Sequence, residues 1–181
     1  MSQPGARRPL WAAFAGLSVA VVAVDQLTKA WLVSFLAPGQ STQVVGDLVR
    51  LVNSQNNGGL FGILRGQAVP FAILSLVVMG LIVGYHARSG RNPYLTVTLG
   101  FLLGGAIGNL LDRIRLGYVV DFVDMGIGTT RFWTFNVADS SITLAVLLLL
   151  LGAFWPTLSE PAAPKADAPA TSASTPARDD A

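Results

Sequence analysis

Three stretches of 20 residues without a charged side chain constrain this chain more than any other feature. They cover residues 66–85, 92–111 and 140–159. A helix of about 20 apolar residues crosses the roughly 30 Å hydrocarbon core of a bilayer. A shorter run, residues 9–24, reaches that length only if its helix continues past Asp25. We therefore predict four transmembrane helices, at about residues 10–34, 67–86, 93–114 and 137–156.

The composition agrees with lipid as the solvent and excludes several kinds of site. The chain is 52% hydrophobic and only 12% charged, whereas soluble domains carry about 25% charged residues. The net charge of +2 is too small to suggest a nucleic-acid partner. There is no cysteine, and His86 is the single histidine. Disulfides, thiolate metal sites and two-histidine metal sites are therefore excluded, and we predict no metal and no cofactor.

Arginines that flank two of the apolar runs predict how the protein is oriented in the membrane. Arg7 and Arg8 precede the first apolar run, and the short segment after the second run carries Arg88 and Arg91. The positive-inside rule places both segments, and hence both termini, in the cytoplasm of a multi-pass cell-membrane protein. A cleaved signal peptide is the alternative for the first run. The helical pattern continues to Leu32 without a small-x-small cleavage site, which favours a retained span.

Two longer segments, residues 37–66 and 115–136, then lie on the extracytoplasmic face. The first contains two β-type runs, residues 42–45 and 48–52, joined by a Gly-Asp turn. The second is rich in aromatic residues and is expected to form an interfacial loop or helix. The fold class is therefore an all-α membrane protein with a small β-rich segment. The Pro- and Ala-rich tail, residues 157–181, is expected to be a disordered cytoplasmic segment.

Polar residues follow or interrupt two of the apolar runs. Asp25 and Lys29 are four residues apart and share one helix face. A structural explanation is an ion pair at the membrane edge, with the lysine reaching toward the interface. Asn109, Asp112 and Arg113 close the third run. Their structural explanation is an interfacial anchor in which Asp112 pairs with a neighbouring arginine.

Three further aspartates lie near the start of the fourth span. Asp121 and Asp124 can belong to a solvated loop, and Asp139 can be a helix N-cap. In an antiparallel bundle, however, the third helix ends where the fourth begins, so Asp121 and Asp139 can meet. Two adjacent carboxylates tend to share one proton, which prepares one as a base and the other as an acid. This arrangement suits hydrolysis of an amide by activated water.

Four motifs in order between the spans carry a resemblance to a known family. They read "DQLTK", "NNGGLFG", "GNLLDRIRLGYVVDF" and "FNVADSSI". Together they resemble the lipoprotein signal peptidases (signal peptidase II), over roughly residues 10–156. The resemblance implies an intramembrane aspartic endopeptidase. Its substrate would be a diacylglyceryl-modified prolipoprotein, cut just before the lipidated cysteine.

The resemblance also implies residue roles. The catalytic pair would be Asp121 and Asp139. The substrate-binding residues would be Asn56, Gly58, Asn109, Arg113 and Asn136. The supporting residues would be Asp25, Lys29 and Asp112. The chain departs from the family pattern at Gly59 and Leu60, where many members have two alanines.

Two other functions compete with this interpretation. A small four-span transporter or channel component would use the acidic pair to bind protons or cations. A peptidase homologue could instead bind lipoprotein precursors without cutting them. The expected partners are lipidated prolipoproteins and membrane lipid, with no nucleic acid, and the expected state is a monomer.

Overall fold

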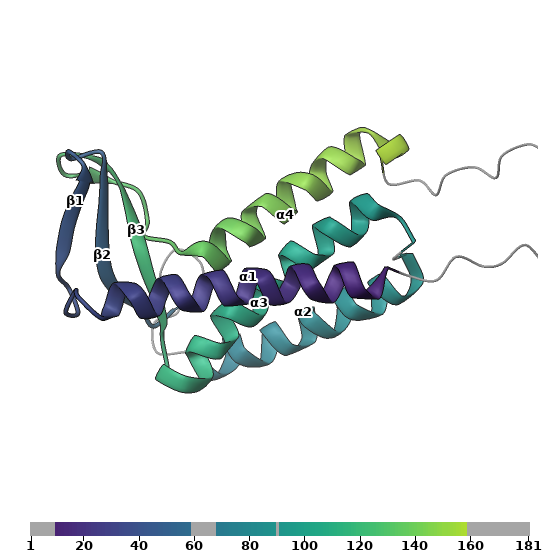
Figure 1. Cartoon of the computed structure of the whole chain (residues 1–181), viewed down its shortest axis with the longest axis horizontal. Helices are drawn as coiled ribbons and strands as arrows, with labels where there is room; N and C mark the ends of the chain where they lie inside the picture. The colour runs from purple at the N-terminus through teal and green to yellow at the C-terminus, as the bar shows by residue number, and fades with distance from the viewer. Residues whose placement is uncertain (1–9, 59–67, 90, 159–181) are drawn as a thin grey trace, which may run out of the picture.

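Four long helices run along the molecule and a small sheet lies at one end of them (Figure 1). The computed structural model describes residues 10–58, 68–89 and 91–158. The first helix begins, and the fourth ends, at the end of the bundle away from the sheet (Figure 1). Of the predicted tail, the described part reaches only a short 3₁₀ turn, Pro156–Leu158. The prediction of disorder beyond it lies outside the described residues.

The helices match the apolar runs of the sequence. They are α1 (Trp11–Val33), α2 (Ala68–Ser89), α3 (Pro93–Leu116) and α4 (Val137–Phe154). Each begins and ends within three residues of its predicted range, and all four are long and apolar enough to cross a membrane. The first helix passes through Asp25 without interruption. Its length therefore confirms that the shorter apolar run continues beyond that carboxylate.

The central helix α3 has clear start and stop signals. Asn92 is its N-cap, with the side-chain oxygen accepting the Leu95 N–H at 3.2 Å, and Pro93 occupies the first turn. Pro suits this position because its missing N–H would have no helical partner there. At the other end Gly117 adopts a left-handed conformation with φ of +78°. Glycine reaches this conformation without steric cost, so the helix ends there and the chain turns into the sheet.

The sheet is antiparallel and has the order β1-β2-β3-β4. The strands are β1 (Ser41–Val45), β2 (Val49–Asn56), β3 (Val119–Ile127) and β4 (Thr130–Arg131). The first two confirm the predicted β-type runs and the turn at Gly46, whose φ is +48°. The expectation of a loop or helix over residues 115–136 is wrong. Half of this segment forms β3 and β4, because β3 pairs with β2 along nearly its whole length.

Glycines on α3 allow close contact with the neighbouring helices. A Cβ on Gly105 would lie 2.5 Å from the Ala138 carbonyl oxygen of α4. A Cβ on Gly108 would lie 2.7 Å from Asp25 Oδ2 of α1. Small residues let membrane helices approach backbone to backbone, where interhelical hydrogen bonds become possible. In consequence, polar groups of α1, α3 and α4 meet at the sheet end of the bundle.

Candidate active site

Asp121 lies on β3 with both carboxylate oxygens accepting amide N–H groups. Asn56 Nδ2, on β2, donates to Asp121 Oδ2 at 2.9 Å. Asn136 Nδ2, just before α4, donates to Asp121 Oδ1 at 2.7 Å. The side chain is 1% exposed. The extended backbone thus points this carboxylate into the space between the sheet and the ends of α3 and α4.

Asp139 lies in the first turn of α4, but it is not the N-cap. That position belongs to Asn136, whose Oδ1 accepts the Asp139 N–H at 2.9 Å. In return, Asp139 Oδ2 accepts the Asn136 N–H at 3.3 Å, which completes a capping box. The N-cap explanation for Asp139 is therefore wrong in its position, although the carboxylate does help to cap the helix. Its other oxygen accepts Asn109 Nδ2 at 2.7 Å.

Two amide side chains join the two carboxylates. Asn136 Nδ2 donates to Asn109 Oδ1 at 3.1 Å, so the chain of contacts runs from Asp121 through both asparagines to Asp139. Among the described residues, no lysine or arginine forms an ion pair with Asp121 or Asp139. The structure thus brings together the two aspartates that the sequence singles out, and it separates them with neutral donors.

The environment of Asp121 raises its pKa to about 7. Burial is the largest cause, because a charged carboxylate loses hydration, and the nearby charge of Asp139 adds to the effect. The hydrogen bonds from Asn56 and Asn136 and the more distant charge of Lys29 act in the opposite direction. A pKa near 7 means that Asp121 is protonated in a large fraction of molecules at neutral pH, which a catalytic acid requires.

Arg113 and Gly58 lie beside the aspartates. Arg113 Nη2 donates to the Gly58 carbonyl at 3.3 Å, and its Nη1 donates to the Asn109 carbonyl at 3.2 Å. Asn56 Oδ1 accepts the Gly58 N–H at 3.0 Å. These contacts gather the predicted substrate-binding residues around the same site. Gly59 and Leu60, where the chain departs from the family pattern, lie outside the described residues.

Lys29, Asp25 and Asp112 form a second polar cluster, beside the one that contains Asp121 and Asp139. In it, one ammonium group pairs with two carboxylates. Lys29 Nζ lies 2.8 Å from Asp25 Oδ2 and 2.8 Å from Asp112 Oδ2. Asp25 is 0% exposed and Lys29 is 4% exposed. The predicted ion pair between Asp25 and Lys29 is present, but the lysine does not reach toward the interface. Asp112 pairs with Lys29 and not with a neighbouring arginine, because Lys29 of α1 comes within reach across the contact with α3.

Each carboxylate of this cluster accepts the backbone N–H of the residue preceding one aspartate of the candidate site. Asp112 Oδ2 accepts the Val120 N–H at 3.1 Å, directly before Asp121. Asp25 Oδ1 accepts the Ala138 N–H at 2.9 Å, directly before Asp139. The cluster therefore fixes the backbone on which both aspartates are carried.

Sequence reasoning missed two participants in this cluster. Gln26 Nε2 donates to Asp112 Oδ1 at 2.9 Å and to Asp25 Oδ2 at 3.2 Å. Gly108 makes room for the Asp25 carboxylate. Both lie inside the quoted motifs, since Gln26 is the second residue of "DQLTK" and Gly108 is the first of "GNLLDR". Their place inside these motifs is the sequence feature that could have identified them as part of the site.

Comparison with known proteins decides the family. The family model described as Signal peptidase (SPase) II matches residues 17–155, which include every residue of the candidate site. The chain belongs to the signal peptidase II family. The chain is similar to a lipoprotein signal peptidase of Staphylococcus carnosus, 38% identical over 136 residues, which cover 75% of this chain and 86% of that protein. A Geobacillus kaustophilus lipoprotein signal peptidase is 39% identical over 144 residues, covering 79% and 94%.

Solved structures agree with the family assignment. A bacterial membrane enzyme determined by the in meso method at 2.3 Å resolution superposes with a TM-score of 0.78 at 30% identity, over 86% of this chain and 96% of that one. A second bacterial membrane enzyme, at 1.9 Å resolution, gives a TM-score of 0.74 at 32% identity. The chain is therefore a peptidase of the signal peptidase II family. The alternative of a transporter or channel component finds no support in these comparisons.

Proposed function

We propose that this peptidase removes the signal peptide from diacylglyceryl-modified prolipoproteins, with Asp121 and Asp139 as its catalytic pair. The observation that carries the proposal is the contact chain in which Asn136 and Asn109 link the two buried carboxylates. Family membership supports the reaction class. The cleaved bond precedes the lipidated cysteine, so the products are a signal peptide with a new carboxylate and a lipoprotein with a free amino group.

The two aspartates take different roles in this mechanism. Asp139 lies in the first turn of α4, where the helix dipole favours a negative charge. It is the base that takes a proton from water, and the oxygen of that water attacks the scissile carbonyl carbon. Asp121, with a pKa of about 7, is the acid that donates its proton toward the carbonyl oxygen. The proton on Asp139 then moves to the departing nitrogen as the C–N bond breaks, and Asp121 takes back a proton from one hydroxyl of the gem-diol as the new carbonyl forms.

The neighbouring polar residues hold the pair and the peptide. Asn109 donates its side-chain N–H to Asp139 and Asn136 donates its own to Asp121, so their role is to position the catalytic pair. The Asn109 side-chain oxygen accepts from Asn136 and from Lys29 Nζ at 3.3 Å, which ties this pair to the neighbouring ion-pair cluster. Arg113, Asn56 and Gly58 form the adjoining wall and contact the substrate backbone. The guanidinium of Arg113 keeps N–H donors beyond its two carbonyl contacts, and these suit a peptide carbonyl.

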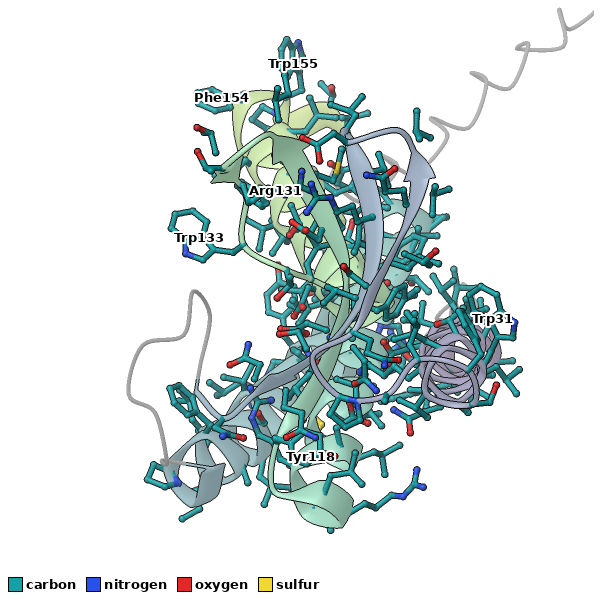
Figure 2. All side chains as sticks on the ribbon, turned by 90° about the vertical axis from the view of Figure 1, so that its left-hand side faces the viewer. Trp31, Tyr118, Arg131, Trp133, Phe154 and Trp155 are labelled. Atoms are coloured by element: carbon teal, nitrogen blue, oxygen red, sulfur yellow. The ribbon has the colours of Figure 1, made fainter. Side chains whose placement is uncertain are left out.

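The sheet end of the molecule is proposed to face the extracytoplasmic side, with both termini in the cytoplasm. Exposed apolar side chains near the sheet, Ile127, Phe132 and Trp133, support contact with the membrane surface. Trp133 projects away from the ribbon (Figure 2). A lipidated precursor would then meet the aspartates at the interface. The enzyme acts as a monomer in this proposal, because one chain supplies both aspartates.

Single cysteines test the orientation cleanly, because the chain has none of its own. A cysteine at position 125, on β3, should react with a membrane-impermeant maleimide added to intact cells. A cysteine at position 89, at the end of α2, should react only after the membrane is opened. Labelling of position 89 in intact cells would contradict the orientation.

Purified protein incubated with a diacylglyceryl-modified precursor tests the reaction. We expect mass spectrometry to show release of the intact signal peptide and a product that begins with the lipidated cysteine. EDTA should leave the rate unchanged, because carboxylates activate the water. Retained binding without cleavage would instead identify a non-cleaving precursor-binding protein.

A further inference from the structure

Phe71 brings helix α2 into contact with the candidate active site. The site residues described above come from α1, α3, the start of α4 and the strands β2 and β3, together with Gly58. Helices α2 and α3 run antiparallel, so the beginning of α2 lies beside the sheet end of α3 (Figure 1). There the guanidinium carbon of Arg113 lies over the Phe71 ring, 5.7 Å from the ring centroid. This distance is within the roughly 6 Å over which an aromatic face attracts a cation.

The ring supplies a kind of contact that the other neighbours of Arg113 do not. Two backbone carbonyls, those of Asn109 and Gly58, accept one N–H each from the guanidinium, at 3.2 Å and 3.3 Å. Among the described residues, Arg113 forms no ion pair with a carboxylate. A carboxylate partner would compete for the N–H donors that a peptide carbonyl needs. An aromatic face attracts the charge through the electrostatic field of the ring, so the remaining donors stay available.

We propose that Phe71 is a positioning residue that holds the Arg113 guanidinium ready for a carbonyl of the substrate peptide. This inference rests on the proposed function, in which Arg113 contacts the substrate backbone. A long arginine side chain has many rotamers, and fixing them during binding opposes association. The ring of α2 and the two carbonyls fix the side chain before the substrate arrives. Because Phe71 acts on Arg113 and not on the two aspartates, it should govern the affinity for the precursor and leave bond cleavage unchanged.

The kinetics of cleavage of a diacylglyceryl-modified precursor by the full chain test this role. Phe71→Leu keeps an apolar side chain but removes the ring, and Phe71→Trp keeps an aromatic face. In a finer series, Phe71 is replaced by phenylalanines with increasing numbers of ring fluorines, which weaken the negative face of the ring with little change in size. The same changes at Phe154 are the matched control, because Phe154 is the last residue of α4 and is 77% exposed. Thermal unfolding in detergent checks that each variant is folded.

We expect KM to rise about fivefold in Phe71→Leu, as the loss of a partly desolvated cation–π contact implies. The value of kcat should stay within about twofold of wild type, because the lost interaction is made equally in the ground state and the transition state. Phe71→Trp should restore KM, and each added fluorine should raise it stepwise. The Phe154 variants should match wild type. A KM that is unchanged in Phe71→Leu or independent of fluorination, or a loss confined to kcat, would overturn the positioning role.

A double-mutant cycle tests whether the ring acts through Arg113. Arg113→Gln removes the cation, so adding Phe71→Leu to it should raise KM little further. Additive losses would show that the ring does not act through the guanidinium and would overturn the inference. Wild-type protein that leaves the precursor uncut would overturn the proposed function and this inference together. Normal cleavage by wild type with no dependence on the ring at position 71 would overturn this inference alone.

Discussion

Two clusters at the sheet end of the bundle each contain a pair of aspartates, but the groups that contact the two pairs differ in charge. Asp25 and Asp112 each lie 2.8 Å from one ammonium group, that of Lys29. Asp121 and Asp139 instead accept N–H groups from neutral asparagines. The shared ammonium group holds both of these carboxylates in fixed positions. Neutral donors leave room for a proton, so the first cluster supports the backbone and the second can exchange protons with a substrate.

The largest expected effect is on turnover, when the second cluster loses a carboxylate. Asp121→Asn or Asp139→Asn keeps the size of the side chain but removes the acid or the base, and each should lower the cleavage rate by about 10²-fold or more. The double variant should cost little beyond the worse single one, because residues that act as a unit are not additive. Cleavage of a lipidated precursor is the measurement.

Asp124→Asn is the matched control for this experiment. Asp124 also lies on β3, but Arg131 Nη2 pairs with it at 2.9 Å, so it resembles the first cluster. Its loss should leave turnover within a few-fold of wild type. Near-normal turnover of Asp139→Asn would mean that this carboxylate serves only the capping box.

The next largest effect is on stability, when the first cluster loses its cation. Lys29→Met leaves Asp25 and Asp112 buried without a counter-ion, and breaking such a pair costs about 3–5 kcal/mol. We expect a clearly lower midpoint of thermal unfolding in detergent, and Arg88→Met should have little effect. Adding Asp112→Asn to Lys29→Met should restore part of the loss. An unchanged midpoint for Lys29→Met would remove the structural role of this cluster.

A smaller effect on stability is expected where α3 approaches Asp25. Gly108→Ala would place a Cβ 2.7 Å from Asp25 Oδ2 and 3.3 Å from the Ala138 Cβ. Such overpacking typically costs about 1–3 kcal/mol. Gly80→Ala on α2 is the matched control, because nothing lies within 4 Å of its added Cβ. Equal unfolding midpoints for the two variants would show that the contact relaxes without cost.

The sequence was most informative where physical periodicity was strong. The uncharged runs located four helices because lipid tolerates few charges over about 20 residues. The β-type residues of 42–45 and 48–52, with the Gly-Asp turn between them, likewise located β1 and β2. Residues 115–136 were harder. Strand β3 forms by pairing with β2, whose Asn56 lies opposite Val119 in the register, and such long-range pairing leaves little local signal.

The candidate site shows the same division. The bundle topology indicated that Asp121 and Asp139 could meet, and the motif resemblance then implied their catalytic roles. The partner of Asp112 could not be inferred, because i,i+1 and i,i+3 arginines lie nearby in sequence whereas Lys29 is distant. Only the close packing at Gly108 brings Lys29 within reach. Contacts between helices depend on shape, which a single sequence records weakly.

The smallest expected effect sharpens the comparison most directly, because it alters the donors of the second cluster and leaves both carboxylates in place. Asn56 donates to Asp121 Oδ2 at 2.9 Å and thereby lowers the pKa of a carboxyl that burial has raised to about 7. Asn56→Ala removes this donor, so the pKa of Asp121 should rise further. Asp121 acts as the acid and loses its proton as the pH rises through its pKa. The alkaline limb of the pH–rate profile should therefore move to higher pH, by about half a pH unit or more, with the maximal rate within about tenfold of wild type.

Ser54→Ala is the control, since Ser54 lies directly opposite Asp121 in the sheet but its hydroxyl contacts Thr134. A limb that stays in place, or moves to lower pH, would mean that Asp121 is not the acid.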